Sequence, residues 1–204
     1  MRSLLGPRLA FDWKIVTVTI VSTLLLIIDA YNPLTPNKGI DRIILYLLIP
    51  LFVVLGVFRE NPGTYGFAIG DWKAGLILTG LGILLIAPIL WLVAHGGAMK
   101  DYYKPQVGGL PWNTFIDLFG WEFFFRGFIL FAYARKFGTD ALWLQAVPFA
   151  LAHIGKPEVE TLSTIFGGFV FAWVAYRTRS FLYPFLIHWF VDSFTIIVAA
   201  GLLG

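Results

Sequence analysis

The chain of 204 residues is 58% apolar and 13% charged, whereas soluble domains are roughly 45–50% apolar and about 25% charged. This composition excludes an ordinary water-soluble domain and predicts an all-α, polytopic transmembrane helical bundle of about six to eight spanning helices, forming a single membrane domain over 1–204. Cysteine is absent, which excludes disulfides and thiol chemistry. The net charge of +3 is small and the basic residues are scattered, which disfavours nucleic acid as a partner.

Seven apolar runs predict the spanning helices from hydropathy. The first follows basic residues, as in a secretory signal, but it is long and lacks a small-x-small cleavage site, so we interpret it as a retained helix. The fifth is short and is expected to form a partial or tilted helix. The runs lie near 15–30, 42–58, 74–95, 114–134, 140–154, 160–177 and 181–203.

Basic residues between these runs predict the orientation, because cytoplasmic loops of membrane proteins are enriched in Lys and Arg. With the N-terminus in the cytoplasm, the inside positions are Arg2, Arg8, Lys14, Arg59, Lys73, Arg135, Lys136, Arg177 and Arg179. The outside positions are then Lys38, Arg42, Lys100, Lys104 and Lys156. We therefore predict a multi-pass protein of the plasma (inner) membrane with a cytoplasmic N-terminus.

The two halves of the chain differ in their buried chemistry. Residues 1–111 form N-terminal helices with almost no ionisable residue inside a span, whereas 112–204 form a motif-bearing half. An ionisable side chain deep in a spanning helix costs at least about 2.5–3.5 kcal/mol, so it normally faces a cavity or a partner. Several such residues in one half predict a shared polar site.

Glu122 and Arg126 are four residues apart and therefore share one helix face. They form either a structural ion pair or a carboxylate that an arginine orients toward water. His188 and Asp192 have the same spacing within the last apolar run, where the carboxylate can fix the imidazole tautomer. His153 follows Phe149 by one turn at the end of a short run, where it is either an interfacial residue or part of a pocket that Phe149 walls.

These three elements resemble, in order, motifs of one membrane-protein family. Trp121-Glu122 through Arg126 is similar to EExxxR, Phe149 through His153 matches FxxxH, and His188 through Asp192 matches HxxxN/D. The family is the CAAX-protease and bacteriocin-processing (CPBP, Abi) group of intramembrane proteases, and the resemblance covers about residues 110 to 200.

The resemblance implies a helical bundle with a water-filled cavity and endopeptidase activity on membrane-embedded or lipidated peptide or protein substrates. Its implied catalytic residues are Glu122, Arg126, His153, His188 and Asp192, with Trp121 and Phe149 in the pocket. Glu122 is expected to be the general base and His153 to share the water, while His188 and Asp192 stabilise the oxyanion. An aspartate can donate there only if protonated, and otherwise it orients His188.

One position departs from the family pattern, because Trp121 stands where the first of two glutamates is expected. Either Glu122 takes over the role of base, or the chain has kept the fold and lost hydrolysis. No metal is favoured, because the HExxH spacing is missing. If zinc or another divalent metal binds, Glu122, His153 and His188 are the expected ligands.

Two other classes of function stay open from the sequence. The first is a catalytically silent membrane scaffold, immunity factor or sorting factor of the same fold, which the Trp121 departure favours. The second is a small transporter with a proton relay, or a redox protein in which His153 and His188 bind haem. No inverted repeat is visible between the halves, which weakens the case for transport.

Overall fold

The computed structural model describes residues 9–203, and this part of the chain is helical with a single isolated bridge between Ile154 and Lys156. This confirms the predicted all-α class. The α-helices are α1 (Trp13–Tyr31), α2 (Lys38–Arg42), α3 (Ile49–Phe52), α4 (Trp72–Val93), α5 (Gly97–Tyr103), α6 (Trp112–Glu122), α7 (Leu130–Phe137), α8 (Ala141–Leu151), α9 (Glu158–Thr178) and α10 (Leu182–Ala199). Three π-helical segments, η1 (Ile43–Leu48), η2 (Val53–Val57) and η5 (Phe123–Ile129), and three 3₁₀ turns, η3 (Pro62–Tyr65), η4 (Lys104–Gly109) and η6 (Gly138–Asp140), join them.

Five helical stretches in the described residues are long and apolar enough to cross a membrane, namely Trp13–Tyr31, Lys38–Val57, Trp72–Val93, Glu158–Thr178 and Leu182–Ala199. The predicted run 114–134 corresponds to the unbroken helical path of α6, η5 and α7. The predicted run 140–154 corresponds to α8, whose 11 residues extend only about 16 Å. Since the hydrocarbon core is about 30 Å thick, α8 ends inside the bundle rather than crossing it.

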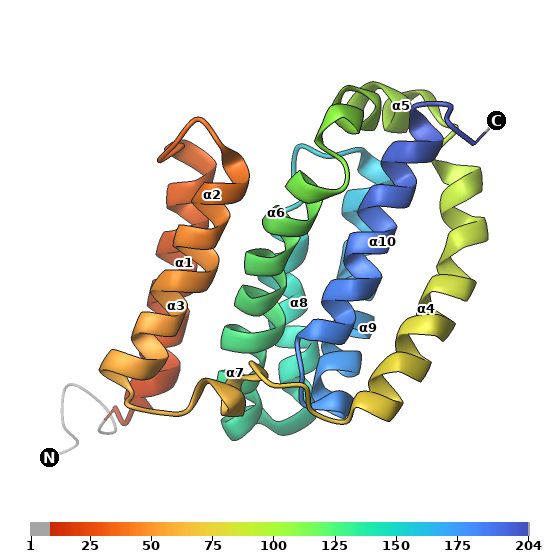
Figure 1. The fold of residues 1–204 in the computed structure, drawn as a ribbon. Coiled ribbons are helices and arrows are strands. Elements are labelled where there is room, and N and C mark those ends of the chain that lie inside the picture. The colour runs from red at the N-terminus through yellow and green to blue at the C-terminus, as the bar shows by residue number, and fades with distance from the viewer. Residues whose placement is uncertain (1–8, 204) are drawn as a thin grey trace, which may run out of the picture.

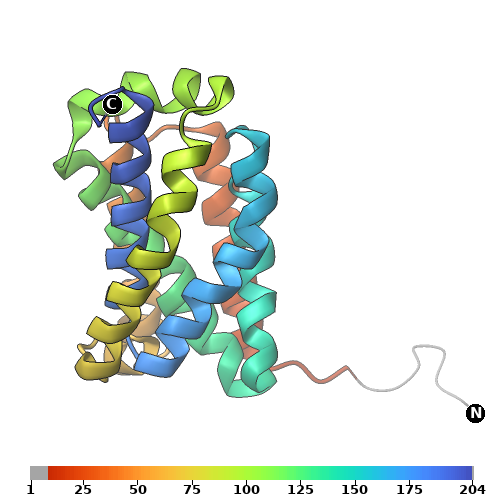
Figure 2. The same ribbon diagram turned by 90° about the vertical axis from the view of Figure 1, so that its right-hand side faces the viewer.

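The long helical stretches form one bundle in which each stretch runs opposite to the next one along the chain (Figure 1). On one side, α1 lies beside the α2–α3 helix and contacts η5 and α7. On the other side, α10 packs between α6 and α4, and α8 packs along α9. Figure 2 shows α4 on the outer face, where it crosses α10 and α9.

Two close helix contacts depend on glycine. A Cβ on Gly75 of α4 would lie 2.3 Å from the ring of Tyr183 in α10. A Cβ on Gly168 of α9 would lie 3.0 Å from Phe149 and 3.1 Å from Ala146, both in α8. Small residues let helices approach closely in membrane proteins, where packing drives association. These contacts fix the position of α10, which carries His188, and of α8, which ends just before His153.

One end of the bundle is tied by charged side chains. Glu60 pairs with Lys14 and Arg135 and accepts a hydrogen bond from the hydroxyl of Tyr65 at 2.6 Å. Burial alone would raise the pKa of Glu60, but the hydrogen bonds from these three residues outweigh it and lower the pKa to about 2. The cluster therefore connects α1, the loop after η2, and α7.

The described basic residues that were used to predict the orientation lie at the two ends of the bundle. Arg177 pairs with Asp71 at the junction of α4 and α9, on the same end as Glu60. Lys38 and Lys156 lie at the opposite end, near α5 and η4. Arg2 and Arg8, which also support the predicted orientation, lie outside the described residues. The assignment of the end that carries Glu60 and Arg177 to the cytoplasm stays a prediction.

Candidate active site

A buried ion pair lies where α6 passes into the π-helical segment η5. Nη1 of Arg126 donates to Oε1 of Glu122 at 2.9 Å, and both side chains are 0% exposed. All seven residues of η5 are buried, four of them phenylalanines. π-Helical turns within longer helices are frequent at functional sites. The predicted contact between Glu122 and Arg126 is present, in a strongly apolar setting.

Aromatic rings surround the guanidinium of Arg126. Its Cζ atom lies 3.8 Å from the ring centroid of Phe149 and 5.1 Å from that of Phe171. Cation–π contacts of this kind contribute about 0.5–2 kcal/mol, and more when water is excluded. Nε and Nη2 of Arg126 are nevertheless buried without a hydrogen-bond partner, as is Oε2 of Glu122. The pair is therefore costly to bury, and its cost points to a role beyond packing.

His188 of α10 contacts the same carboxylate. Its Nδ1 lies 2.6 Å from Oε1 of Glu122, and its ring lies against Phe149 and Phe171 at centroid distances of 6.0 and 5.2 Å. Oε1 of Glu122 already accepts a hydrogen bond from Arg126, and an ionised carboxylate can only accept hydrogen bonds. Nδ1 of His188 is therefore the donor, and Nε2 is left for water or a ligand.

His153 lies two residues beyond the end of α8. Its Nδ1 donates to the backbone oxygen of Phe149 at 2.7 Å, because a carbonyl oxygen can only accept. Its own backbone oxygen accepts from the hydroxyl of Thr161 in the first turn of α9 at 2.8 Å. The residue is 2% exposed. A neutral imidazole held by Nδ1 in this way presents an unprotonated Nε2.

Both histidines line one cavity of about 660 Å³ between α4, α9 and α10. Most of its wall is aliphatic or aromatic, and Phe149 belongs to it. Asp192 lies one turn beyond His188 in the same wall. The remaining polar wall residues come from several elements, namely Tyr103, Glu160, Ser163, Thr164 and Thr195. Glu122 and Arg126 do not line this cavity, because they lie behind His188.

The cavity opens between α4 and α9. Wall residues on both helices are also exposed on the outer surface, namely Leu81, Leu85 and Ile89 on α4, and Val159, Val170 and Trp173 on α9. Because the same residues line the cavity and are exposed on the outer surface, the cavity is open to the outside along this wall. Since these residues are apolar and belong to candidate spanning helices, the opening faces the lipid.

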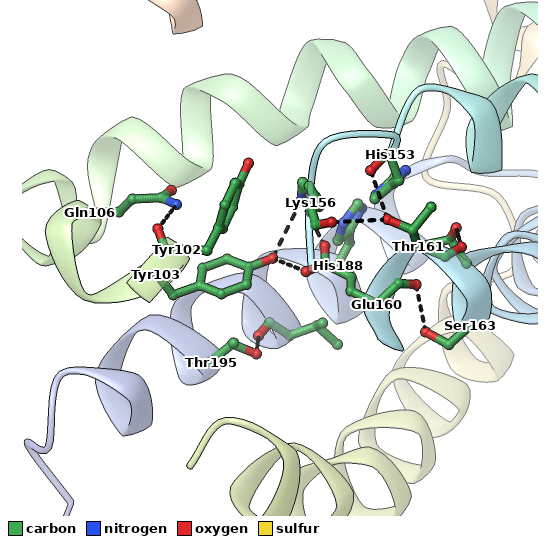
Figure 3. A network of polar contacts seen from close by, with 12 residues as sticks. Tyr102, Tyr103, Gln106, His153, Lys156, Glu160, Thr161, Ser163, His188 and Thr195 are labelled. Atoms are coloured by element: carbon green, nitrogen blue, oxygen red, sulfur yellow. Dashed lines mark hydrogen bonds and ion pairs between the residues drawn. The ribbon is translucent and has the colours of Figure 1, made fainter. Parts of the chain in front are cut away.

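A polar network not predicted from the sequence joins α5 to the start of α9 (Figure 3), and two of its members, Tyr103 and Glu160, line the cavity. Tyr103 of α5 donates to Oε2 of Glu160 at 2.6 Å, and Lys156 donates to Oε1 of the same carboxylate at 2.8 Å. Burial lowers the pKa of Lys156, but the carboxylates of Glu160 and Asp192 raise it by more. The only hint in the sequence is the run of charged residues before the sixth apolar segment.

Trp121 does not line the cavity, although the sequence places it in the pocket. Its indole stacks on Arg42, with the guanidinium carbon 4.1 Å from the ring centroid, and meets the ring of His153 edge-on at 5.7 Å. The adjacent Gly120 allows this, since a Cβ there would lie 2.7 Å from the backbone oxygen of Arg42. The position of the family's first glutamate thus lies between a cation and His153.

The predicted metal ligands do not form a complete donor set. Among residues 9–203, no group of three or more His, Cys, Asp or Glu side chains is arranged to hold a metal ion. Oε1 of Glu122 already contacts Arg126 and His188, so a second cation there would be repelled by the guanidinium. The three side chains as placed therefore do not form the metal site for which they would be the expected ligands.

The fold and the site define a polytopic helical membrane protein whose bundle encloses a cavity lined by two histidines, with a carboxylate behind one of them. Residues 105–194 match the family model described as Type II CAAX prenyl endopeptidase Rce1-like. This match confirms the resemblance to the CAAX-protease family, whose members are endopeptidases acting on membrane-associated peptides. No curated protein and no solved structure matches the chain.

Proposed function

We propose that this protein is an intramembrane endopeptidase that uses water to cleave a membrane-associated peptide. The observation that carries the proposal is the pair of histidines, His153 and His188, in the wall of one cavity that opens toward lipid. Their Nδ1 atoms have different partners, a backbone oxygen for His153 and a carboxylate for His188. This difference gives the two rings different tasks.

His153 is the proposed general base. A water in the cavity attacks the carbonyl carbon of the scissile bond, and Nε2 of His153 takes the proton of that water. The same proton then passes to the leaving nitrogen as the C–N bond breaks, which yields a carboxylic acid and an amine. A positioned base of this kind contributes about 10²–10⁴-fold to the rate. His153 suits the task because its Nδ1 partner leaves Nε2 free to accept.

His188 is the proposed oxyanion donor. When both ring nitrogens carry a proton, Nδ1–H donates to Glu122 and Nε2–H can donate to the oxygen that becomes negative. Asp192 lies one turn away on the same face of α10 and lines the cavity beside it. In this proposal Glu122 acts through His188 as a positioning residue, whereas the sequence predicts it to be the base.

The apolar wall between α4 and α9 is the proposed binding site for the apolar or lipidated part of the substrate. Its volume of about 660 Å³ lies within the usual range of ligand pockets, roughly 300–1,000 Å³. A peptide anchored in the bilayer can enter it sideways without first leaving the lipid. The site therefore favours substrates that are already held in the membrane.

The test is cleavage of a lipidated, membrane-anchored fluorogenic peptide by the purified protein in liposomes. We expect His153→Ala, His188→Ala and Glu122→Gln each to reduce turnover at least about 100-fold with folding retained. His95→Ala is the matched control, since His95 also donates from Nδ1 to a carbonyl one turn earlier, at 2.6 Å, but lies outside the cavity. Wild-type turnover in His153→Ala would remove it as the base, and wild-type turnover in all three would refute the site.

A catalytically silent relative is the second candidate, and a specific observation favours it. Trp121 replaces the family's first carboxylate, and Glu122 does not line the cavity. Trp121→Glu separates the two candidates, because it places a carboxylate between Arg42 and His153. A silent wild type that gains turnover in Trp121→Glu, but not in Trp121→Gln, would identify the loss of this carboxylate as the cause of silence.

A further inference from the structure

The turn that follows α8 carries His153, the proposed general base, into the wall of the cavity. α8 ends at Leu151, and α9 begins at Glu158. Between them the side chain of Ile154 is 72% exposed, and a Cβ on Gly155 would meet open space. Packing therefore does little to hold this part of the turn, and the position of His153 depends on hydrogen bonds.

One of these hydrogen bonds comes from the first turn of α9. The hydroxyl of Thr161 donates to the backbone oxygen of His153 at 2.8 Å and lies 3.4 Å from the backbone oxygen of Lys156. The backbone N–H of Lys156 donates to the same oxygen of His153 at 3.0 Å. Thr161 does not line the cavity, so a change at this hydroxyl acts on the turn rather than on a bound molecule.

A polar network fastens the same turn to α5 (Figure 3). The ammonium of Lys156 donates to Oε1 of Glu160 at 2.8 Å and lies 3.4 Å from the hydroxyl of Tyr103, which donates to Oε2 of the same carboxylate at 2.6 Å. Tyr103 is itself fixed, because it packs with Met99 of α5 against Ile196 of α10. The side chains of the ion pair are only 22% and 18% exposed, so salt screens their attraction less than that of an exposed pair.

The two histidines of the cavity are oriented by different means. His188 is held by the carboxylate of Glu122, whereas the imidazole of His153 has no hydrogen-bond partner on another side chain among residues 9–203. We infer that Thr161 and Lys156 are positioning residues for His153, which hold the turn so that Nε2 of the imidazole faces the cavity. This inference rests on the proposed peptidase function and adds the residues that place its base. The placement matters because a displacement of about 1 Å from the reactive geometry can lower a rate about 100-fold.

Histidine NMR tests the positioning without depending on turnover. The chain has three histidines, so selective ¹⁵N labelling of the full-length protein in nanodiscs gives few signals, and His153→Ala identifies the signal of His153. We expect a neutral imidazole protonated only at Nδ1 in the wild type and a mixture of both tautomers in Thr161→Val and Lys156→Met, because a looser turn keeps the bond to the oxygen of Phe149 only part of the time. Thr161→Ser, which keeps the hydroxyl, should retain the wild-type signal. His95 is the internal reference, because its Nδ1 also bonds a carbonyl oxygen one turn earlier, at the end of α4.

Turnover of the lipidated fluorogenic peptide gives the second readout. Thr161→Val should lower kcat about 10–100-fold at unchanged KM, and Thr161→Ser should restore it. Thr178→Val is the matched control, since Thr178 also donates a buried hydrogen bond, to the backbone oxygen of Val174 at 2.7 Å, but at the other end of α9. Thr161→Val is the decisive variant because it changes no charge, whereas Lys156→Met also removes a cation near Asp192.

A His153 signal in Thr161→Val identical to that of the wild type would overturn the inference, even if kcat fell. A rise in KM at unchanged kcat would overturn it as well, because it would place the effect on binding rather than on the base. A wild type that cleaves no peptide, together with an altered His153 signal in Thr161→Val, would instead refute the peptidase proposal and leave the positioning in place.

Discussion

The buried pair of Glu122 and Arg126 gives the most quantitative prediction. Replacing Arg126 by Met leaves an uncompensated carboxylate in a site where both side chains are 0% exposed. Breaking a buried pair in this way costs about 3–5 kcal/mol. Loss of the contact with Phe149, 3.8 Å from the guanidinium, adds about 0.5–2 kcal/mol. At roughly 2–4 °C per kcal/mol for a chain of this size, Arg126→Met should melt on the order of 10 °C below wild type.

The double variant Glu122→Gln/Arg126→Met should recover most of this loss, because it removes both charges and keeps a side chain of similar length at each position. Melting is followed by tryptophan fluorescence in detergent at one scan rate, since unfolding of membrane proteins is often irreversible and only the rank order is then secure. Arg177→Met is the matched control. It breaks a pair whose side chains are 53% and 44% exposed, and such exposed pairs are worth at most about 1 kcal/mol.

Two results would contradict this reasoning. The first is an Arg126→Met variant that melts with the wild type, which would mean that Glu122 is neutral or reaches water. The second is a double variant no more stable than Arg126→Met, which would mean that arginine packing, rather than charge compensation, stabilises η5.

Three further predictions concern the ends and the packing of the bundle. Glu60→Gln should melt below wild type at pH 7, and the two melting temperatures should converge near pH 2. The pKa of Glu60 is about 2 in the folded protein and about 4.3 in the unfolded chain, so its ionised form stabilises the fold above pH 4.3 and this stabilisation is lost as the pH falls to 2. Melting curves that stay parallel over this pH range would contradict the prediction. Gly75→Val should destabilise the protein by about 1–3 kcal/mol through a clash with a tyrosine ring of α10, whereas Gly80→Val, which faces open space, should not, and equal melting temperatures would disprove the close contact. Because the chain has no cysteine, Lys104→Cys should react with an impermeant maleimide from outside intact cells and Lys136→Cys only after permeabilisation, and the reverse pattern would invert the topology.

The helices were predictable from the sequence because hydropathy reports directly on the solvent around a span. The predicted runs 15–30 and 74–95 correspond to α1 and α4, and the short run 140–154 corresponds to the short helix α8. The contact of Glu122 with Arg126 was predictable for a similar reason, since residues four apart share a face of a helix. Local periodicity suffices for features of this kind.

The contacts between helices were not predictable in this way. The hydrogen bond from His188 to Glu122 joins residues 66 positions apart, and no local pattern specifies which rotation of α10 brings them together. The same holds for Glu160, whose partner Tyr103 lies 57 positions earlier in the chain. The π-helical segment η5 also leaves no clear trace in the apolar periodicity, because every residue in it is buried.

The placement of Glu122 behind His188 gives a physical reason for burying a charged pair that a well-packed apolar core would avoid. Arg126 donates to the carboxylate, the carboxylate holds Nδ1 of His188, and the ring is thereby fixed with its other nitrogen available at the cavity. Removing either charge would loosen the orientation of the ring even if the fold survived. The buried ion pair is thus less stabilising than an apolar pair of the same size, but it orients the imidazole of His188. The imidazole of His153 is oriented instead by a hydrogen bond to the backbone of α8.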